Sequence, residues 1–437
     1  MEEFAKGKVI KLVSGDEITI VSKIGEGGQG IVYKVEYKDK EYALKWYLNS
    51  YLKGMSENST SNVDRFYKNL VNNATMGIPA KAFLWPLAVT EIQDGSFGYI
   101  MDLRPAEYQS FVKFLNAAVR FKSTSVVINA TLNMVTAFQA LHRKGYSYQD
   151  LNDGNFFVNP DNGDVLICDN DNVAPYGDGF GISGKSRYMA PEVVLGKSRP
   201  NLDTDLFSLS VVLFMFYFLS HPLEGAKVAS CPCLTDEAEK RFYASEPIFV
   251  CDPKDTSNRP VRGIHNNVIY LWPLFPKFLQ DAFIRAFTRG SKEIDQRIME
   301  AEWRKIFYRL KDDIVSCPKC GEENFAGLAT NDIVECCECK NRINKPLSFS
   351  GKDYEIALIP GKTITEWHAY DGDYSKVVGS VVQNKTNPNL WGIRNLSDKL
   401  WIVNYPNGEE KTIKQNEVFP IVKDVHINFG NKKALIK

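Results

Sequence analysis

The chain lacks three features that would define its class directly. It carries no net charge, because Lys plus Arg and Asp plus Glu number 53 each, which argues against a nucleic-acid protein that works by broad electrostatics. It has no recognisable signal peptide, since its start, MEEFAKGKVIK, is charged and lacks an apolar core. Its longest apolar run, 206–219, is interrupted by Ser208 and Ser210 and is shorter than the ~20 residues of a membrane span. We therefore expect a cytoplasmic protein with neither a membrane nor a nucleic-acid partner, and a buried core helix over 206–219.

Cysteine is scarce except in one short segment. Five of the nine cysteines lie between 317 and 339, where two CxxC pairs are separated by a 15-residue spacer. The pairs are Cys317 with Cys320 and Cys336 with Cys339. Each pair offers two thiolates at one turn, and two such turns complete a tetrahedral S₄ site for structural zinc. The spacing predicts a zinc ribbon over 313–345, with Cys337 as a spare thiol, rather than a disulfide framework.

A length of 437 residues is too great for one compact core, so two to three domains are expected. Residues 8–45 alternate apolar and polar positions between glycine turns, as in an antiparallel sheet. A helix is expected around 63–74, and the pattern from 107 to 312 is mainly helical, with an ordered loop at 222–262. Residues 346–437 are short strand-like runs separated by turns. The fold class is therefore α+β.

Four short motifs that can handle phosphate follow one another in a fixed order, and a fifth closes the set. They are Gly25, Gly27 and Gly30 in GEGGQG, Lys45 in YALK, Asp150 and Asn155 in YQDLNDGN, Asp169 in ICDND, and Ala190-Pro191-Glu192. Taken alone, the first would be a glycine-rich turn, the second a solvated strand lysine and the third a polar surface loop. Glycines let backbone amides approach phosphate closely, and carboxylate and amide oxygens suit hard cations. Together the motifs supply every part that phosphoryl transfer from ATP requires.

With these motifs the chain resembles a eukaryotic-type (Hanks-type) protein kinase over roughly residues 15–312. The resemblance implies a bilobal protein-kinase fold over 1–312, with a small lobe over about 1–102 and a large lobe over about 103–312. In the family, Lys45 would bind the α- and β-phosphates, Asp150 would accept the substrate hydroxyl proton, and Asn155 and Asp169 would hold Mg²⁺. The residues implied to bind ATP are Gly25, Gly27, Gly30, Val32, Ala43, Lys45, Met101, Asp102 and Leu103.

One part of the family pattern is missing from the small lobe. The family pairs its phosphate-binding lysine with a glutamate on the next helix, but Asn69 stands at the aligned position. Asp64 is the nearest carboxylate on that helix, and Glu57 precedes it. Either the pairing is rebuilt with another group, or Lys45 is held by Asp169 and phosphate alone.

The motif YQDLNDGN at 148–155, which corresponds to the catalytic loop of the family, differs from the family pattern in its charged residues. Asn152 replaces the loop lysine, and Lys185 stands at the position of the threonine that lies near it in the family. Our hypothesis is that Lys185 supplies the missing positive charge and belongs to the catalytic residues. Gln149 replaces the arginine that holds a phosphorylated activation segment, which suggests that this switch is absent. Serine/threonine specificity is the default for the family and does not follow from these residues.

One further residue and one residue pair support the alignment of the large lobe. Asp205 begins the long apolar helix, as the structural aspartate of the family does. Glu192 of the closing motif is expected to pair with Arg297, which lies just before Glu302 and Trp303. Both roles would be structural.

The last segment, 346–437, resembles a forkhead-associated (FHA) β-sandwich through Asn395-Leu396-Ser397, a polar hairpin and the closing VHINFG. Such domains read phosphothreonine through an arginine and a serine. Here Gly379-Ser380 stands where Gly-Arg would be, and Arg394 is the only arginine of the segment. We expect an FHA-like module used for docking, with low affinity for phosphothreonine peptides.

The order of kinase, zinc ribbon and FHA-like module looks like bacterial kinases of the tellurium-resistance-associated phosphorylation triad. This resemblance implies a metal-dependent phosphatase and a von Willebrand factor A-type protein as partners, beside a protein substrate.

Two hypotheses remain open on the sequence alone. The first is an active ATP- and Mg²⁺-dependent protein kinase, which the retained Lys45, Asp150, Asn155 and Asp169 favour. The second is a pseudokinase-like nucleotide-binding scaffold that recruits partners. The missing glutamate, Asn152 and the DND motif, Asp169-Asn170-Asp171 in place of the family's DFG, favour it. The Ala-Pro-Glu segment argues against a small-molecule kinase.

Overall fold

The structure is a computed structural model that describes residues 3–58, 61–178 and 184–437. The side chains of 56–58, including that of Glu57, lie outside the described part. The chain divides into two compact units. The first comprises 1–122, 126–272 and 280–304, and the second comprises 123–125, 273–279 and 305–437.

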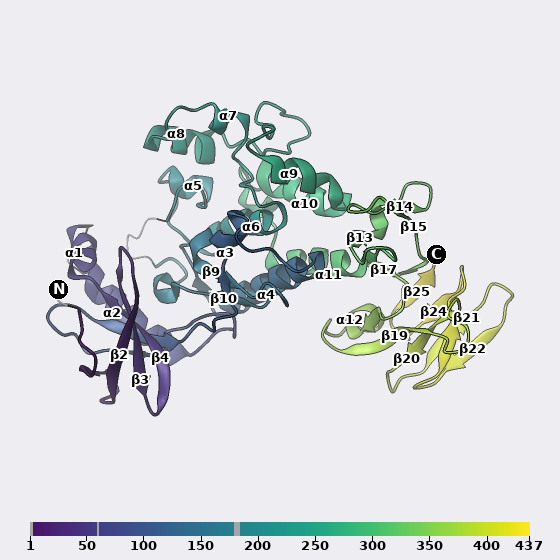
Figure 1. The fold of residues 1–437 in the computed structure, drawn as a ribbon, viewed down its shortest axis with the longest axis horizontal. Coiled ribbons are helices and arrows are strands. Elements are labelled where there is room, and N and C mark those ends of the chain that lie inside the picture. The colour runs from purple at the N-terminus through teal and green to yellow at the C-terminus, as the bar shows by residue number, and fades with distance from the viewer. Residues whose placement is uncertain (1–2, 59–60, 179–183) are drawn as a thin grey trace. The chain divides into compact units, whose positions relative to one another are not determined.

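The N-terminal part of the first unit is an antiparallel sheet of six strands in the order β1-β2-β3-β4-β6-β5 (Figure 1). The strands are β1 (Val9–Lys11), β2 (Glu17–Glu26), β3 (Gly30–Tyr37), β4 (Lys40–Tyr47), β5 (Ala88–Val89) and β6 (Gly98–Asp102). Successive side chains of a strand point to opposite faces. On β4, Leu44 and Trp46 therefore join one hydrophobic cluster, and Ala43 and Tyr47 join the other. The sheet confirms the antiparallel pattern that the sequence predicts.

Two helices follow β4. The second, α2 (Asn62–Met76), lies where the sequence predicts a helix, and its Phe66 and Leu70 are buried in the same cluster as Ala43 and Tyr47. The first, α1 (Asn49–Asn58), is not expected from the sequence. The face of the sheet that carries Ala43 and Tyr47 is thus covered by α2.

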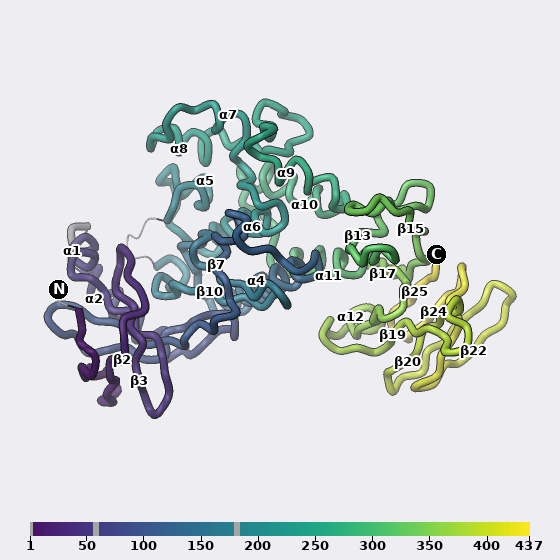
Figure 2. Tube along the Cα trace, viewed as in Figure 1, coloured from purple at the N-terminus to yellow at the C-terminus, as the bar shows by residue number. Residues whose placement is uncertain are grey.

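Two long helices form the centre of the C-terminal part of the first unit: α4 (Thr124–Arg143) and α6 (Leu202–Phe218) (Figure 2). Every residue of α6 from Thr204 to Phe218 is buried, which confirms the predicted core helix. A capping box starts α6, because the side chain of Asn201 accepts from the Thr204 amide (3.1 Å) and Thr204 Oγ1 accepts from the Asn201 amide (2.8 Å). Further helices along this stretch of the chain are α3 (Phe111–Leu115), α5 (Pro191–Val194), α9 (Asn266–Leu271), α10 (Lys277–Thr288) and α11 (Glu300–Asp312).

Short strands frame the loops that follow α4. They are β7 (Gln109–Ser110), β8 (Tyr146–Ser147), β9 (Phe156–Val158), β10 (Val165–Ile167) and β11 (Ala174–Pro175). β7, β9 and β10 form one small sheet, and β8 pairs with β11. Asp150 and Asn155 therefore lie on the loop between β8 and β9, and Asp169 lies on the loop between β10 and β11.

The insert 222–262, predicted from the sequence as an ordered loop, also contains short helices. It contains α7 (Ala226–Ala229), α8 (Asp236–Lys240) and a π-helical turn, Arg241–Ser245. Thr235 Oγ1 caps α8 by accepting from the amide of Ala238 (3.3 Å), and Phe242 and Tyr243 are buried. Helices of four or five residues are too short to produce a periodic apolar pattern, so the sequence did not reveal them.

The second unit begins with two small hairpins, β12 (Ile314–Ser316) with β13 (Glu323–Phe325) and β14 (Ile333–Glu335) with β15 (Arg342–Asn344). The last eight residues of α11, 305–312, fold with this unit. There Tyr308 stacks on Tyr374 with ring centroids 3.7 Å apart, and Asp312 Oδ2 lies 3.0 Å from Nε2 of His368.

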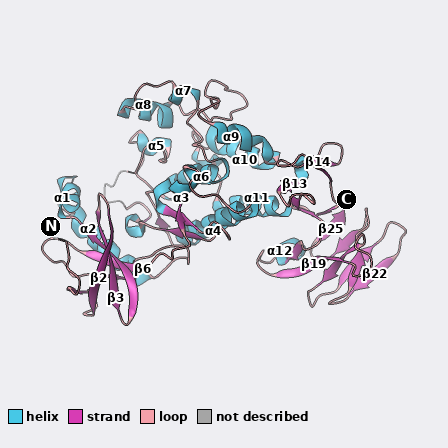
Figure 3. Ribbon diagram, viewed as in Figure 1, coloured by secondary structure: helices cyan, strands magenta, loops and turns pink. Residues whose placement is uncertain are grey.

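Two antiparallel sheets make up the rest of the second unit (Figure 3). The six-stranded sheet has the order β17-β16-β25-β24-β21-β22 and the four-stranded sheet the order β18-β19-β20-β23. Their strands are β16 (Ser348–Ser350), β17 (Glu355–Ala357), β18 (Thr363–Thr365), β19 (Val377–Gln383), β20 (Trp391–Asn395), β21 (Trp401–Asn404), β22 (Glu410–Ile413), β23 (Val418–Pro420), β24 (His426–Asn428) and β25 (Lys433–Ile436). A short helix, α12 (Glu366–Ala369), connects β18 and β19. Ile356 and Ile427 of one sheet share a core with Ile393 and Phe419 of the other, which is compatible with the predicted β-sandwich.

Among the residues that the structure describes, none of the helices combines the length and the apolar character that a membrane span needs.

Candidate active site

The glycine-rich segment forms the tip of the hairpin between β2 and β3. The amide of Gly27 donates to the carbonyl of Gly30 (2.9 Å) and closes the turn. At Gly30 a Cβ atom would lie 2.4 Å from the carbonyl oxygen of Trp46, so only glycine fits this position. At Gly25 and Gly27 a Cβ atom would meet nothing within 4 Å, so the space beside the turn is open.

The apolar residues that the resemblance implies in ATP binding lie together. Val32, Ala43, Met101 and Leu103 all belong to one hydrophobic cluster, and Ala43 is paired with Met101 across β4 and β6. Asp102 is exposed at the end of β6. Leu166 and Cys168, which the sequence did not single out, pack against the same cluster from the segment before Asp169. The cluster thus joins the sheet to the loop that carries the predicted metal ligand.

The side chain of Lys45 is buried, and its amine forms hydrogen bonds with three other side chains. Its Nζ lies 2.7 Å from Oδ2 of Asp171, 3.2 Å from Oδ1 of Asp169 and 2.6 Å from Oε1 of Gln29 in the glycine-rich turn. Burial disfavours the charged amine, but the carboxylates of Asp171 and Asp169 outweigh it and raise the pKa of Lys45 well above its ordinary value. Lys45 is therefore a charged group aimed at the predicted metal ligand.

Helix α2 does not supply the missing carboxylate. The side-chain amides of Asn69 and Asn73 both donate to the carbonyl of Val173, at 2.7 Å and 2.9 Å. Asp64 is exposed at the start of the helix. The first alternative from the sequence is the one found: the pairing of Lys45 is rebuilt, and the new partner is Asp171 from the DND motif.

The catalytic loop is held by bonds to its own backbone. Nδ2 of Asn155 donates to the carbonyl of Asp150 (2.8 Å), and Nδ2 of Asn152 lies 3.2 Å from Oδ1 of Asp150. Burial raises the pKa of the Asp150 carboxyl to about 6, helped by the nearby Asp169 and Asp171 and opposed by the Asn152 hydrogen bond. A carboxyl group with this pKa is ionised at neutral pH yet basic enough to take a proton.

Asp205 fixes the start of this loop from the first turn of α6. Its Oδ2 accepts from the amide of Tyr148 (2.5 Å) and its Oδ1 from the amide of Gln149 (3.0 Å). Gln149 has a φ of 72° and Asp169 a φ of 53°, values that a non-glycine residue adopts only when its surroundings impose them. The two predicted functional loops therefore both contain strained backbone.

Lys185 lies beside the loop position that lost its lysine. Its Nζ is 3.4 Å from Oδ1 of Asn152 and 3.6 Å from Oδ1 of Asp153. Nε2 of Gln149 donates to the carbonyl of Asp178 in the activation segment (2.8 Å). The Gln149 side chain thus joins the catalytic loop to the activation segment, which runs from Asp169 to Glu192. In the family, an arginine at the position of Gln149 holds a phosphate group of that segment.

The expected ion pair behind the site is present. Nη1 and Nη2 of Arg297 contact the two carboxylate oxygens of Glu192, each at 2.8 Å, and the Arg297 side chain is nearly buried. This bidentate geometry confirms the predicted pair and anchors the Ala-Pro-Glu segment.

Sequence reasoning missed three side chains of the site: Asp171, Tyr47 and Gln29. Asp171 carried a detectable signal, because it is a carboxylate two residues after the predicted metal ligand, where the family has a small residue. Tyr47 and Gln29 carried none, since a strand tyrosine and a glutamine in a turn have no fixed role.

The four cysteines predicted to bind zinc form a cluster in the second unit. Their sulfur atoms all lie within 4.8 Å of one another, with Cys317 to Cys339 and Cys320 to Cys336 both at 3.6 Å. These distances are far too long for disulfides and close to the ~3.8 Å edge of a tetrahedron with Zn–S bonds of about 2.3 Å.

Amide groups around the cluster fit the same interpretation. Asn324 Nδ2 lies 3.7 Å from the sulfur of Cys336, and Asn341 Nδ2 lies 3.7 Å from the sulfur of Cys317. Although burial opposes it, backbone amides lower the pKa of the Cys317 thiol to about 6, and the pKa of Cys336 is lowered in the same way. Donors that favour thiolates are what a metal-binding cluster requires.

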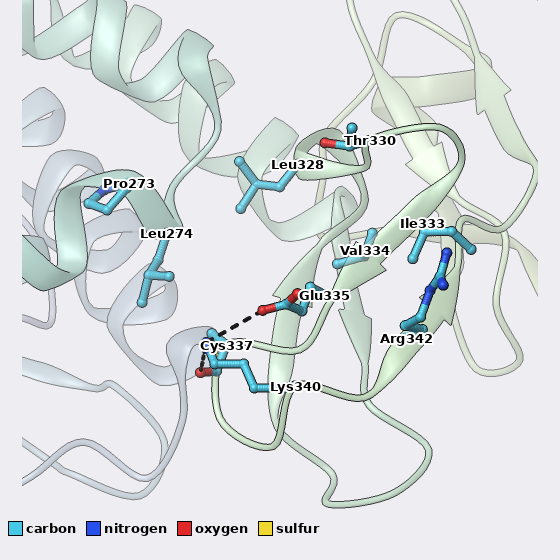
Figure 4. Close-up of a pocket in the computed structure, with 10 residues that line it drawn as sticks. All are labelled: Pro273, Leu274, Leu328, Thr330, Ile333, Val334, Glu335, Cys337, Lys340 and Arg342. Atoms are coloured by element: carbon cyan, nitrogen blue, oxygen red, sulfur yellow. Dashed lines mark hydrogen bonds and ion pairs between the residues drawn. The ribbon is translucent and has the colours of Figure 1, made fainter.

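A cavity of about 560 Å³ lies beside the cysteine cluster and is lined by Cys337 (Figure 4). Its lining mixes the apolar Leu274, Leu328 and Ile333 with charged groups. Nζ of Lys340 joins two of the lining residues, 3.7 Å from Oε1 of Glu335 and 3.2 Å from the carbonyl of Cys337 (Figure 4). The spare thiol is thus separate in position from the four clustered sulfurs.

In the C-terminal sheets, Asn395 and Gly379, two of the residues compared with the FHA pattern, pack inside the fold. Asn395 is buried and its side chain bonds to Lys399, Ile413 and Ser397. A Cβ at Gly379 would meet the ring of Trp401 at 2.6 Å. Ser380 is the direct cross-strand neighbour of Arg394.

A six-stranded sheet, a helical lobe and a lysine–aspartate–asparagine set between them define a protein kinase domain. The model of the protein kinase domain family matches residues 18–238, just over half of the chain, and the chain belongs to this family. A relative is the probable serine/threonine-protein kinase gdt4 of Dictyostelium discoideum, 23% identical over 220 residues. The match covers 48% of this chain but only 12% of that protein.

Proposed function

We propose that the chain is an ATP- and Mg²⁺-dependent protein kinase, acting on serine or threonine hydroxyls of a protein partner. The observation that supports the proposal is the arrangement around Lys45, whose amine lies 3.2 Å from Asp169 while Asn155 is bonded to the backbone of Asp150. A phosphate-binding cation, a base and two oxygen ligands for a metal would thus come from three separate segments, around residues 45, 150–155 and 169. The curated relative is a probable serine/threonine kinase, which favours the same specificity.

Each side chain would have one task in the transfer. Asp150 orients the substrate hydroxyl and takes its proton as the oxygen forms a bond to the γ-phosphorus and the bond to the ADP oxygen breaks. Lys45 holds the α- and β-phosphates of the nucleotide. Asp169 and Asn155 offer the oxygens that would hold Mg²⁺, which supplies positive charge to the phosphates. The open space beside Gly25 and Gly27 leaves room for phosphate under their amides.

The test is transfer of labelled γ-phosphate from ATP by the purified chain, with the chain itself and a generic protein as acceptors. We expect Asp150→Ala to lower the rate at least 100-fold, because the hydroxyl loses both its orientation and its base. The matched control is Asp161→Ala, which removes an exposed aspartate between β9 and β10 and should leave the rate unchanged. Bound ATP without any transfer by the wild-type chain would favour the nucleotide-binding scaffold instead.

We further propose zinc as the metal of the four-cysteine cluster and an FHA-like docking role for the C-terminal sheets. The sulfur geometry supports the first proposal, and the two antiparallel sheets with a shared core support the second. The resemblance to kinases of the tellurium-resistance-associated triad makes a metal-dependent phosphatase and a von Willebrand factor A-type protein the proposed partners.

A further inference from the structure

We propose that Asp171 is the positioning residue of Lys45 and replaces the carboxylate that protein kinases carry on the helix after the lysine strand. The inference rests on the proposed kinase function and names how its phosphate-binding lysine is held. It also assigns a task to Asp171, the last residue of the DND motif, at a position where the family pattern has no charged side chain.

The contacts of Asp171 are those of a charge partner. Its side chain is 1% exposed, and its Oδ2 accepts hydrogen bonds from Nζ of Lys45 (2.7 Å) and from the hydroxyl of Tyr47 (2.6 Å). Its Oδ1 is buried and has no hydrogen-bond partner among the described residues. A buried carboxylate with one unsatisfied oxygen is costly unless an opposite charge lies beside it. Lys45 provides that charge, so the pair is held together by electrostatics as well as by geometry.

The backbone around Asp171 keeps it in place. Residues 170–172 form a 3₁₀ turn, and Nδ2 of Asn170 donates to the carbonyls of Leu84 (2.8 Å) and Ile167 (2.9 Å). The carboxylates on either side of Asn170 differ in exposure. Asp169 has a 40% exposed side chain, whereas that of Asp171 is almost fully buried. The loop therefore separates two tasks, with Asp169 available to a metal and Asp171 reserved for Lys45.

Helix α2 has a different role in this arrangement. Asn69 and Asn73 tie it to the carbonyl of Val173, two residues beyond Asp171. The hydrogen bonds of Lys45 to described residues go instead to Asp171, Asp169 and Gln29. In the family, a displaced helix separates the glutamate from the lysine. Here the carboxylate and the lysine both lie outside the helix, so a displacement of α2 does not in itself break the pair.

Asp171→Asn in the full chain tests the inference, because it removes the charge and preserves the size of the side chain. We expect kcat for γ-phosphate transfer to fall about 100-fold, since a misplaced Lys45 no longer aligns the phosphates. Tyr47→Phe, which removes one bond to Oδ2, should lower kcat about threefold to tenfold. Asp161→Asn serves as the exposed control and should change nothing. Melting temperatures of all four proteins separate a positioning role from a structural one.

Binding measurements make the result independent of turnover. We expect Asp171→Asn to weaken Mg·ATP at least threefold and to leave adenosine affinity unchanged, because adenosine has no phosphate for Lys45 to hold. Unchanged kcat and unchanged or tighter Mg·ATP binding would overturn the inference, as would equal losses for Mg·ATP and adenosine. If Asp171→Asn does not fold, Tyr47→Phe decides: reduced kcat at an unchanged melting temperature supports the inference, and unchanged kcat overturns it. Absence of transfer by the wild-type chain refutes only the proposed function, because the two nucleotide affinities still test Asp171.

Discussion

Three carboxylates of the candidate site differ in burial, and this difference fits the three tasks proposed for them. Asp150 is half-buried, and burial raises the pKa of its carboxyl to about 6, as suits a base that works at neutral pH. The Asp169 side chain is 40% exposed, so it remains accessible to a cation, while that of Asp171 is 1% exposed and faces the lysine. In the proposed mechanism, the same chemical group would serve as base, metal ligand and charge partner within one site.

The positive charge beside the base belongs to Lys185, whose amine lies 3.4 Å from Oδ1 of Asn152. We expect Lys185→Ala to lower kcat about tenfold, because negative charge that develops during transfer loses a nearby cation. Steady-state kinetics with varied ATP is the measurement. Lys197→Ala, at an exposed position after α5, is the control. Turnover and ATP affinity that both remain unchanged in Lys185→Ala would refute the hypothesis.

Single residues show where sequence reasoning succeeds and where it stops. Four site residues could be predicted because each lies in a short motif and the motifs follow one another in the order of the kinase family. They are Lys45, Asp150, Asn155 and Asp169. The partner of Lys45 could not be predicted, because its carboxylate comes from a loop 126 residues away and only the fold brings the two together. The Glu192–Arg297 pair was predictable because both residues stand at motif positions.

At the scale of elements, the two cysteine hairpins repeat one design. The amide of Cys317 donates to the carbonyl of Glu322 (2.8 Å), and the amide of Cys336 donates to that of Asn341 (2.9 Å). We expect one zinc per chain by elemental analysis, and we expect Cys339→Ser to lose it because three thiolates no longer close the tetrahedron. Cys337→Ser should retain the zinc, since the sulfur of Cys337 lies outside the cluster. Equal zinc loss in both variants would contradict the assignment of the ligands.

A buried histidine links three helices of the first unit. His142 of α4 contacts Glu300 of α11 through Nδ1 and lies 3.2 Å from Asp205 of α6 through Nε2. Burial opposes the charge, but hydrogen bonds to Asp205 and Glu300 raise the pKa of His142 to about 9. The folded state therefore binds the proton more tightly than the unfolded state does.

Stability should depend on pH accordingly. The contribution of His142, roughly 3 kcal/mol, is present below pH 6.5 and is lost as the pH rises through about 9. We expect the melting temperature of the wild-type chain to fall more between pH 6 and pH 9.5 than that of His142→Gln. Equal falls in the two proteins would show that His142 is not charged in the folded state.

Elements were predictable where their length produced a pattern. The apolar run over 206–219 predicted a buried helix, and α6 is found there. α1, α7 and α8 were missed because their sequences are short or polar, and their boundaries depend on caps and tertiary packing.

Across the folded kinase domain, three contacts join the segments of the candidate site, and none of them involves a phosphate group. Gln149 bonds to the backbone of the activation segment at Asp178, α2 bonds to Val173, and Lys45 is paired with Asp171. None of these contacts requires a modified residue. We therefore expect the chain to need no prior phosphorylation for activity.

We expect this site to transfer the ATP γ-phosphate as folded. The most direct measurement is the initial time course of labelled phosphate transfer by wild-type chain shown by intact mass to be unphosphorylated, beside Asp150→Ala. The expected result is transfer to a protein acceptor that is linear from the start with Mg²⁺ and absent in Asp150→Ala. Mg·ATP binding without transfer, or transfer that Asp150→Ala retains, would contradict this expectation.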